Sequence, residues 1–236
     1  TISEIFNHDK DMIAFIQRVL GYALLGYVKD HVFFIFYGDK GFNGKGVIMN
    51  TCKAVLGRKL AAQIRSELLI KSKQDKAEGA PNSALMVLRA KRLVWASETD
   101  EGQTFSSEKV KWLTGGDELC GRNPYDKREQ DWEASHTLFL NTNHLPHVQN
   151  DNAFWERTFP VEFTQSFVRN PQKEYEHQMD DELEHKLKEE ASGILAWLVR
   201  GTYNCLKHGL NPPEAVLKAK EKYIEAEDTL GRFIKA

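Results

Sequence analysis

Four short apolar runs along the chain predict buried strands, and stretches of helical periodicity between them predict an alternating α/β arrangement. The runs are rich in β-branched and aromatic residues, as in strands that are covered on both faces of a sheet. They cover 32–37, 92–97, 137–140 and 158–163. Helical segments are predicted over 8–28, 47–56, 61–70, 83–90, 106–113 and 151–157. This alternation predicts a three-layer α/β core with a mainly parallel sheet.

Beyond the fourth apolar run the pattern becomes helical. Amphipathic stretches cover 174–208, with a break expected near Gly193, and 212–228. The second stretch begins with Pro212 and Pro213, and proline is favoured in the first turn of a helix. The predicted organisation is therefore an N-terminal packing helix within 1–30, a core over 31–165 and a C-terminal helical segment over 166–236.

Composition limits the class of protein. With 236 residues and 41% hydrophobic content, the chain can form one sizeable domain. The net charge of -2 excludes a globally basic nucleic-acid binder but leaves local basic loops possible. Three separated cysteines without a CxxC motif predict a reduced, intracellular protein, and no apolar run is long enough to span a bilayer. Because the sequence starts at Thr1 rather than methionine, we expect a piece of a longer protein.

A glycine-rich loop follows the first predicted strand and precedes a helix. It reads GDKGFNGKG, and its candidate phosphate-binding residues are Gly38, Gly41, Asn43, Gly44, Lys45, Gly46 and Val47. Glycines allow successive backbone N–H groups to surround an anion, the helix presents its positive end, and a lysine reaches the terminal phosphates. The order strand, glycine loop, helix therefore favours a phosphate-binding loop over an incidental glycine turn.

The loop departs from the standard GxxxxGK[ST] pattern at two positions. Its first glycine, Gly38, lies one residue too early, which lengthens the loop. The Ser or Thr that binds Mg²⁺ through its hydroxyl is replaced by Gly46. The metal must then be held through water or by acidic groups elsewhere.

Polar residues follow the second and third predicted strands. Glu98, Asp100 and Glu101 come directly after the second strand, and carboxylates at this place bind Mg²⁺ and polarise water in nucleotide hydrolysis. The third strand ends in a cluster of Asn141, Thr142 and Asn143, where an amide can hold a water beside a γ-phosphate. A metal site at His144 and His147 lacks a third ligand at suitable spacing, so ordinary loop histidines are favoured.

Two loops contain cations that are candidates for contacting nucleic acid. The strand-like runs 118–122 and 137–140 bracket a polar stretch that suits a hairpin tip. This tip carries Lys127 and Arg128 among acidic residues, so the charge count alone favours a solvated loop. Lys71, Lys73 and Lys76 lie in a polar segment for which a solvated connector is an equal alternative.

Five motifs occur in an order that resembles one family. They are FYGDKGFNGKG, LVWASETDEG, VKWLTGGDELCGRNPYD, LFLNTNHLPHV and DNAFWERTFPVEF. Together they resemble the helicase (ATPase) domain of phage and plasmid primase–helicases, superfamily-three helicases with an AAA+ type P-loop core. The C-terminal segments ASGILAWLVRGTYNCLKHGL and AEDTLGRFI are similar to the helical part that follows this core. The resemblance extends from about Phe15 to the end of the chain.

The resemblance implies roles for individual residues. Lys45, with Gly41, Asn43 and Gly44, is similar to the phosphate-binding motif, and Glu98 to the Walker B acid that holds Mg²⁺. Asn143 is similar to the polar sensor that positions water. Arg157 matches the arginine finger that enters the site of a neighbouring subunit, and Lys127 and Arg128 fall where the family has its DNA-contacting hairpin.

The resemblance implies an ATP- and Mg²⁺-dependent DNA helicase motor of a phage or plasmid replication protein. Such a protein is expected to form a hexameric ring on single-stranded or forked DNA, with a fused primase or polymerase domain, in the host-cell cytoplasm. One alternative is an ATP-binding ring or clamp that holds DNA with little hydrolysis, which the glycine at position 46 favours. A small-molecule kinase is a third hypothesis, but it leaves Asn143 and Arg157 without a role.

Overall fold

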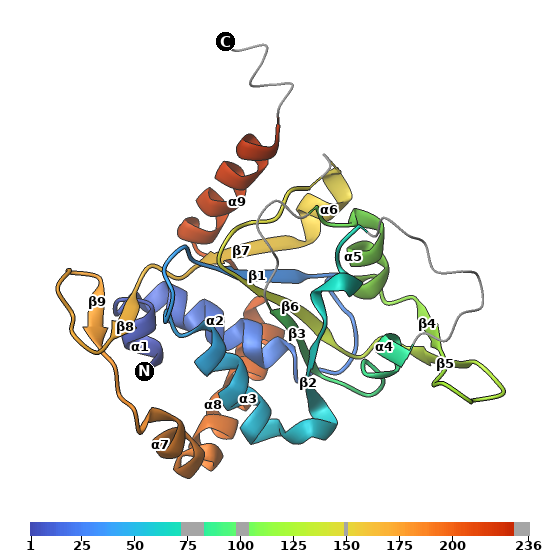
Figure 1. The fold of residues 1–236 in the computed structure, drawn as a ribbon, viewed down its shortest axis with the longest axis horizontal. Helices are drawn as coiled ribbons and strands as arrows, with labels where there is room; N and C mark the ends of the chain where they lie inside the picture. The colour runs from blue at the N-terminus through green and yellow to red at the C-terminus, as the bar shows by residue number, and fades with distance from the viewer. Residues whose placement is uncertain (72–82, 98–103, 149–150, 229–236) are drawn as a thin grey trace.

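The computed structural model describes residues 1–71, 83–97, 104–148 and 151–228, and Figure 1 shows their helices packed around one central sheet. Five strands form this sheet in the order β2, β3, β6, β1, β7, and every adjacent pair is parallel. They are β1 (Phe33–Tyr37), β2 (Ala61–Ile64), β3 (Leu93–Ser97), β6 (Thr137–Thr142) and β7 (Thr158–Glu162). Since the strands are parallel, the loops that follow β1, β3 and β6 lie along the same edge of the sheet.

Both faces of the sheet are covered. Side chains alternate between the faces of a strand, so Phe34 and Phe36 of β1 belong to one core, whereas Phe33 and Ile35 belong to the other. The first core includes side chains of α2 (Lys10–Tyr22), α3 (Lys45–Leu60) and α8 (Ala191–His208). The second includes side chains of α4 (Ser83–Met86), α5 (Ser107–Thr114) and α6 (Asn152–Arg157). The predicted three-layer α/β fold with C-terminal helices is therefore confirmed.

Helices from the two ends of the chain pack together. A Cβ atom on Gly201 of α8 would lie 2.0 Å from the carbonyl oxygen of Gln17 in α2, and one on Gly21 would lie 2.2 Å from the Thr202 nitrogen. Only glycine permits backbones to approach this closely. Helices α2 and α8 thus form one layer on the sheet, and α8 also contacts α3.

The prediction of a helix over 61–70 is wrong. This segment forms β2, which pairs with β3 in the register Ala61 to Leu93, and then a 3₁₀ turn over Ser66–Leu68. Gly57 ends the regular part of α3, because its φ of 75° does not continue a helix. Ala61 and Ile64 are buried, and pairing with the edge of the sheet overrides their local helical spacing.

The hairpin is placed correctly, but its second strand was wrongly predicted. β4 (Glu118–Gly121) pairs antiparallel with β5 (Gln130–Glu133), whereas the predicted partner at 137–140 belongs to β6 in the central sheet. The sequence of β5, QDWE, is polar and was therefore missed. Figure 1 shows that this hairpin projects away from the body of the molecule, so its tip is free to meet a ligand or partner.

The C-terminal segment is less helical than predicted. Residues 174–182 are outside helices and include β9 (Glu176–Gln178), which pairs in parallel with β8 (Ser166–Val168). Helix α7 (Leu183–Glu189) is separated from α8 at Glu190 rather than near Gly193. Helix α9 (Glu214–Glu227) follows Pro213 as predicted. None of the helices in the described part of the chain combines the length and apolar character of a membrane span.

Candidate functional site

The glycine loop connects the carboxyl end of β1 to the first turn of α3. Gly44 has a φ of 90° and lies at the N-cap of α3, so an L side chain would strain this position. A Cβ atom on Gly38 would lie 2.5 Å from the Phe163 carbonyl oxygen. These two glycines therefore allow the sharp turn and close packing that direct the backbone into the helix.

Asn43 holds the loop in shape from within. Its side chain is 4% exposed, and Nδ2 donates to the carbonyl oxygens of Lys40 at 2.7 Å and Gly38 at 3.4 Å. These bonds close the loop on itself. In this structure Asn43 acts on the loop's conformation.

Lys45, the first residue of α3, is 7% exposed. Its Nζ donates to the Gly38 carbonyl oxygen at 3.1 Å and to Asn143 Oδ1 at 3.3 Å. Burial lowers the pKa of Lys45 to about 8, and the charge of Asp39 partly opposes this change. The ammonium is thus held by neutral oxygens, an arrangement that a phosphate oxygen can improve.

The polar end of β6 meets Lys45 at the edge of the sheet. Asn143 is exposed and accepts from the Lys45 ammonium, so the structure brings together two residues that are 98 positions apart. Asn141 is 7% exposed, and its Oδ1 atom has no hydrogen-bond partner among the described residues. Asn141 lies opposite Ser97 of β3 in the strand register. Glu98, Asp100 and Glu101 follow directly but lie outside the described residues.

A cavity of about 770 Å³ opens above these residues. One side is formed by the start of α3 and the ends of β3 and β6, including Lys45, Gly46, Val47, Ser97, Asn141 and Asn143. The other side is formed by α1 (Ile2–Ile5), the region of β8 and β9, and α7. This volume falls within the range of about 300–1,000 Å³ that small-molecule sites occupy.

Gly46 lies in the first turn of α3 and is exposed. A Cβ atom at this position would meet no atom within 4 Å, and the backbone is not in the left-handed region. The absence of the usual Ser or Thr therefore has no steric cause. Any hydroxyl introduced here would be accommodated beside Lys45.

Arg157 lies at the opposite end of the sheet from Lys45. It precedes Thr158, which is level with the first residue of β1, whereas the glycine loop follows the last residue of β1. Five residues of strand separate the two ends by about 16 Å. Arg157 therefore does not reach the glycine loop of its own chain.

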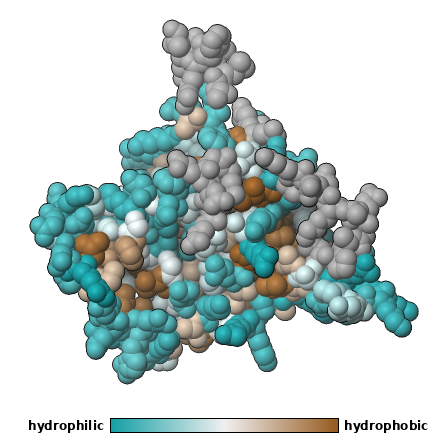
Figure 2. Space-filling model, in the orientation of Figure 1, coloured by the Kyte–Doolittle hydropathy of each residue, from teal (hydrophilic) through white to brown (hydrophobic). Residues whose placement is uncertain are grey.

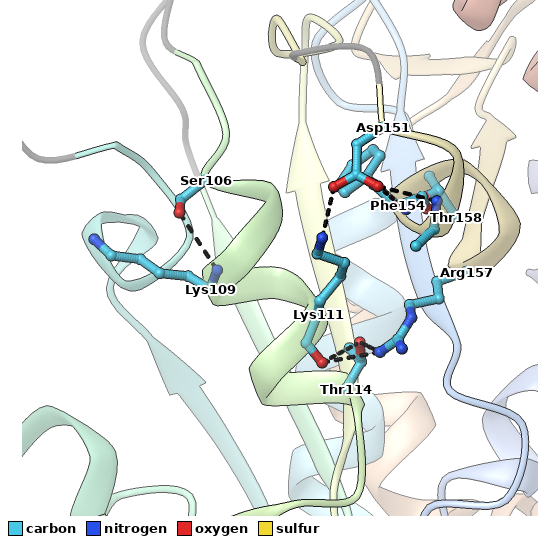
Figure 3. Close-up of polar contacts among 9 residues, drawn as sticks. Ser106, Lys109, Lys111, Thr114, Asp151, Phe154, Arg157 and Thr158 are labelled. Atoms are coloured by element: carbon cyan, nitrogen blue, oxygen red, sulfur yellow. Dashed lines mark hydrogen bonds and ion pairs between the residues drawn. The ribbon is translucent and has the colours of Figure 1, made fainter.

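The Arg157 guanidinium contacts the C-terminal end of α5, as Figure 3 shows. Its Nη1 donates to the Lys111 carbonyl oxygen at 2.9 Å and to Thr114 Oγ1 at 3.3 Å. Asp151, six residues before Arg157, accepts from Lys111 Nζ at 2.7 Å and caps α6. The Lys111 ammonium also holds the pKa of Asp151 below its usual value. Lys111 and Arg157 thus lie close together at this end of the sheet. The charge of Lys111 is neutralised by Asp151, whereas the Arg157 guanidinium donates to uncharged oxygens.

The hairpin tip presents exposed cations together with an aromatic ring. Lys127 and Arg128 are exposed, and Tyr125 is fully exposed with a φ of 74°. Asp126 is engaged in the turn, because its Oδ2 accepts from Asn123 Nδ2 at 3.1 Å. The sequence analysis identified the cations but missed Tyr125, because a single tyrosine in a polar turn gives no sign of a binding role.

The remaining candidates are the lysines of the polar segment near 71–76 and the histidines that were considered as metal ligands. Lys71 is exposed, whereas Lys73 and Lys76 lie outside the described residues. His147 Nδ1 lies 3.1 Å from Glu227 Oε1 and links α9 to the loop after β6. Within residues 1–71, 83–97, 104–148 and 151–228, no group of three His, Cys, Asp or Glu residues is placed to hold a metal ion.

Comparisons with known proteins agree with the motifs. No protein-family model matches the chain. It is 26% identical over 260 residues to a protein of Invertebrate iridescent virus 3 named "Putative helicase", and 24% identical over 236 residues to a protein of African swine fever virus named "Putative primase". The alignments cover 99% and 95% of this chain but 26% and 24% of those proteins. The chain thus spans about a quarter of the length of the curated relatives it matches.

Solved structures show the same fold. Two apo structures of the NrS-1 C-terminal region superpose with TM-scores of 0.66 and 0.65, at 16% and 14% sequence identity. Each covers 97% of this chain and 50% of the other. The resemblance to primase–helicases is confirmed by the relatives named as helicase and primase, and the solved structures show the same fold over 97% of this chain.

Proposed function

We propose that this chain is the ATP-hydrolysing motor of a DNA helicase in a viral, phage or plasmid replication protein. The observation that carries the proposal is the meeting of Lys45 and Asn143 beside a glycine loop, within a cavity of about 770 Å³. The similarity to viral helicase and primase proteins over nearly the whole chain supports the assignment to replication. A fused primase or polymerase domain and a place in the host-cell cytoplasm are part of this proposal.

Nucleotide binding rests on the start of α3. Backbone N–H groups of Gly44 to Val47 point from a helix N-terminus, where they favour an anion. Lys45 exchanges its carbonyl contact for the β- and γ-phosphates, and Asn143 orients the attacking water. Glu98, which directly follows Ser97 in the sequence, polarises this water, and Ser97 itself pairs with Asn141 in the strand register.

The residues present suit Mg²⁺ without the hydroxyl missing at Gly46. Glu98 follows Ser97, and Asn141 offers a buried oxygen that lacks a partner among the described residues. Mg²⁺ prefers oxygen ligands such as carboxylates, and the waters that it retains donate to hydroxyl and amide oxygens. When bound, the ion would supply positive charge that offsets the negative charge of the phosphates.

The position of Arg157 supports a ring. Because it lies about 16 Å from its own loop, its proposed contact with a γ-phosphate requires a neighbouring copy. A closed ring of identical subunits provides one such neighbour for every site. We propose a hexamer on single-stranded or forked DNA, with Lys127 and Arg128 facing the strand. Mass in solution with and without ATP and DNA tests the assembly.

Replacing Lys127 and Arg128 with alanine together should weaken single-stranded DNA binding and reduce its salt dependence. Each lost phosphate contact lowers the slope of log affinity against log salt by about 0.7, so the pair lowers it by about 1.4. Tyr125→Ala should weaken binding by about 1–3 kcal/mol through lost base stacking, with the slope unchanged. Tyr125→Phe is the matched control and should bind normally. If the slope of log affinity against log salt is unchanged in the double variant, the DNA phosphates contact another surface, and Lys71 is the next residue to test.

An ATP-dependent clamp with little hydrolysis is the second candidate function, and Gly46 is the observation that favours it. The clamp and the motor differ in phosphate release when ATP and single-stranded DNA are both present. A motor also separates a forked duplex, whereas a clamp retains it. Phosphate release and strand separation together support the motor, and DNA-bound rings without either support the clamp.

Gly46→Ser should raise ATP turnover and lower the Mg²⁺ concentration needed for half-maximal rate by about tenfold. The serine fits without a clash, and one charge-assisted contact contributes about 1.5 kcal/mol. Gly46→Ala is the control, because it shares the gain in helix propensity of about 0.5–1 kcal/mol but adds no hydroxyl. If the two variants show the same turnover and the same Mg²⁺ requirement, the side chain at position 46 does not contribute to metal binding.

A further inference from the structure

Helix α8 has two apolar faces, and the described residues cover only one of them. Leu198, Gly201 and Cys205 are buried, and the face that they form packs against α2. The outer face of α8 is formed by six exposed residues at helical spacing, namely Ser192, Leu195, Ala196, Val199, Tyr203 and Leu206. Its large side chains are well exposed, with 53% of Val199 and 65% of Tyr203 accessible to solvent.

The outer face of α8 differs from its surroundings in being apolar. A helix that is apolar on both sides is normally covered on both, because apolar side chains gain free energy when they leave water. In the view of Figure 2 most of the surface is hydrophilic, and hydrophobic residues gather in limited areas. An exposed apolar face that extends from Ser192 to Leu206 therefore marks a site of interaction.

The spacing of the outer face indicates that its partner is a helix. Ser192, Val199 and Leu206 follow one another at intervals of seven residues, and Ala196 and Tyr203 are also seven apart. Residues seven positions apart lie in one row along a helix, and such rows are the contact lines of paired helices. The covered face of α8, which packs against a helix, shows the same interval between its buried residues 198 and 205.

The outer face of α8 is complementary to itself when reversed. Its N-terminal half has small residues, Ser192, Gly193 and Ala196, and a Cβ atom on Gly193 would meet no atom within 4 Å. Its C-terminal half has large ones, Tyr203 and Leu206. Two copies of α8 in antiparallel orientation place the large residues of one against the small residues of the other. A two-fold axis makes this match twice.

Charges at the two ends of α8 favour the same orientation. Glu189, the last residue of α7, and Lys207 are both exposed and lie about five helical turns apart, on one edge of the outer face. Helical hydrogen bonds continue through Glu190 between the two helices. An antiparallel copy brings Lys207 to Glu189 of the other chain, whereas a parallel copy brings like charges together. Arg200 lies on this edge near the middle of α8, where its exposed side chain stays in water.

We propose that the outer face of α8 binds the outer face of α8 in a second copy of this chain, in antiparallel orientation. The contact is distinct from the one proposed at Arg157. Helix α8 contributes to the core on one face of the sheet, whereas α5 and α6 contribute to the core on the other. The described residues that line the cavity above Lys45 include none from α8. Pairing through α8 therefore requires neither nucleotide nor DNA.

Sedimentation of the chain without ATP or DNA tests the pairing. One pair of helices is a small interface, so we expect a reversible monomer–dimer equilibrium with a Kd below about 100 μM. Val199→Asp should weaken it at least about 100-fold, because it buries a carboxylate without a partner. Leu217→Asp is the matched control, since Leu217 is an exposed apolar residue of α9, and this variant should dimerise normally. Thermal unfolding checks that both variants are folded.

Exchanging charges tests the orientation. Lys207→Glu and Glu189→Lys each place like charges together at both ends of the pair, so each variant alone should dimerise about tenfold more weakly. An equimolar mixture of the two variants should dimerise as well as the unmodified chain, because every end then joins opposite charges. If the mixture is as weak as its components, the antiparallel orientation is refuted.

Two further results would overturn the proposal. One is a chain that stays monomeric at about 200 μM, above the expected Kd. Binding of such a monomer to phosphatidylserine vesicles would then assign the outer face of α8 to a membrane surface. The other is a dimer that Val199→Asp leaves unchanged. Arg157→Ala should dimerise normally, so loss of ATP turnover in that variant is a separate outcome.

Discussion

Lys45→Ala is expected to abolish ATP hydrolysis and to weaken triphosphate binding by about 10- to 100-fold. The ammonium is buried against the Gly38 carbonyl and Asn143 Oδ1, and no described carboxylate is paired with it. A charge-assisted contact of this kind contributes about 1.5–3 kcal/mol to binding. The other lysine of the loop, Lys40, lies over the Tyr175 ring and does not replace it. Normal turnover in this variant would remove the phosphate-loop interpretation.

The pKa of Lys45 gives this prediction a pH dependence. Because burial lowers it to about 8, the lysine of the free protein is charged below pH 8 and becomes neutral above it. Triphosphate binding requires the charged form, so binding takes up a proton above pH 8. Affinity should then fall as pH rises, approaching about tenfold per unit. Lys45→Arg, which stays charged, is the control and should show no such fall.

The lowered pKa of Lys45 also determines whether the free energy of unfolding of the nucleotide-free protein rises or falls with pH. The value in the folded protein lies below the ordinary value of 10.5, so the unfolded chain binds more protons between about pH 8 and 10.5. The contribution of Lys45 to the free energy of unfolding therefore rises with pH across this range. Bound nucleotide should reverse this dependence on pH, because its phosphates stabilise the charged form of Lys45.

The sequence predicted those elements whose signal is local. The continuous apolar runs of β1, β3 and β6 are buried on both faces, and this is the pattern that an enclosed parallel strand requires. β7 lies at the edge of the sheet and is buried over most of its length. β2 and β5 were missed because pairing partners decide their conformation. β2 lies at the edge of the sheet and contains two alanines, whereas β5 is polar and forms only with β4.

The site divides in a similar way. Lys45 and Asn143 were expected together, since each follows a predicted strand and parallel strands end at the same edge. The buried Asn141 oxygen, which has no hydrogen-bond partner within the described part of the chain, depends on strand register. The contact of Arg157 with α5 depends on how two helices pack. No periodicity in the sequence carries that information.

Arg157→Ala is expected to fold and bind ATP but to lose about 10³-fold or more of its turnover. The structure gives this residue a local role as well, since its guanidinium contacts carbonyl and hydroxyl oxygens at the end of α5. Loss of those contacts should cost about 1 kcal/mol of stability, which thermal unfolding measures. Thr114→Val is the control, because it removes one of the contacts and leaves the guanidinium in place. Turnover in this control should change only a few-fold.

Mixing Arg157→Ala with Lys45→Ala separates the local role from the action on a neighbour. The two residues lie at opposite ends of the sheet, so an interface can join an intact loop from one variant to an intact arginine from the other. Part of the turnover should return on mixing, because an arginine finger contributes about 10³ to 10⁵ in rate in other nucleotide hydrolases. A purely structural arginine restores nothing, since its defect stays within its own chain. If mixed rings form and remain inactive, either Arg157 does not act on its neighbour or every subunit of the ring must be intact. Full activity of Arg157→Ala alone would refute the assignment of Arg157 as an arginine finger.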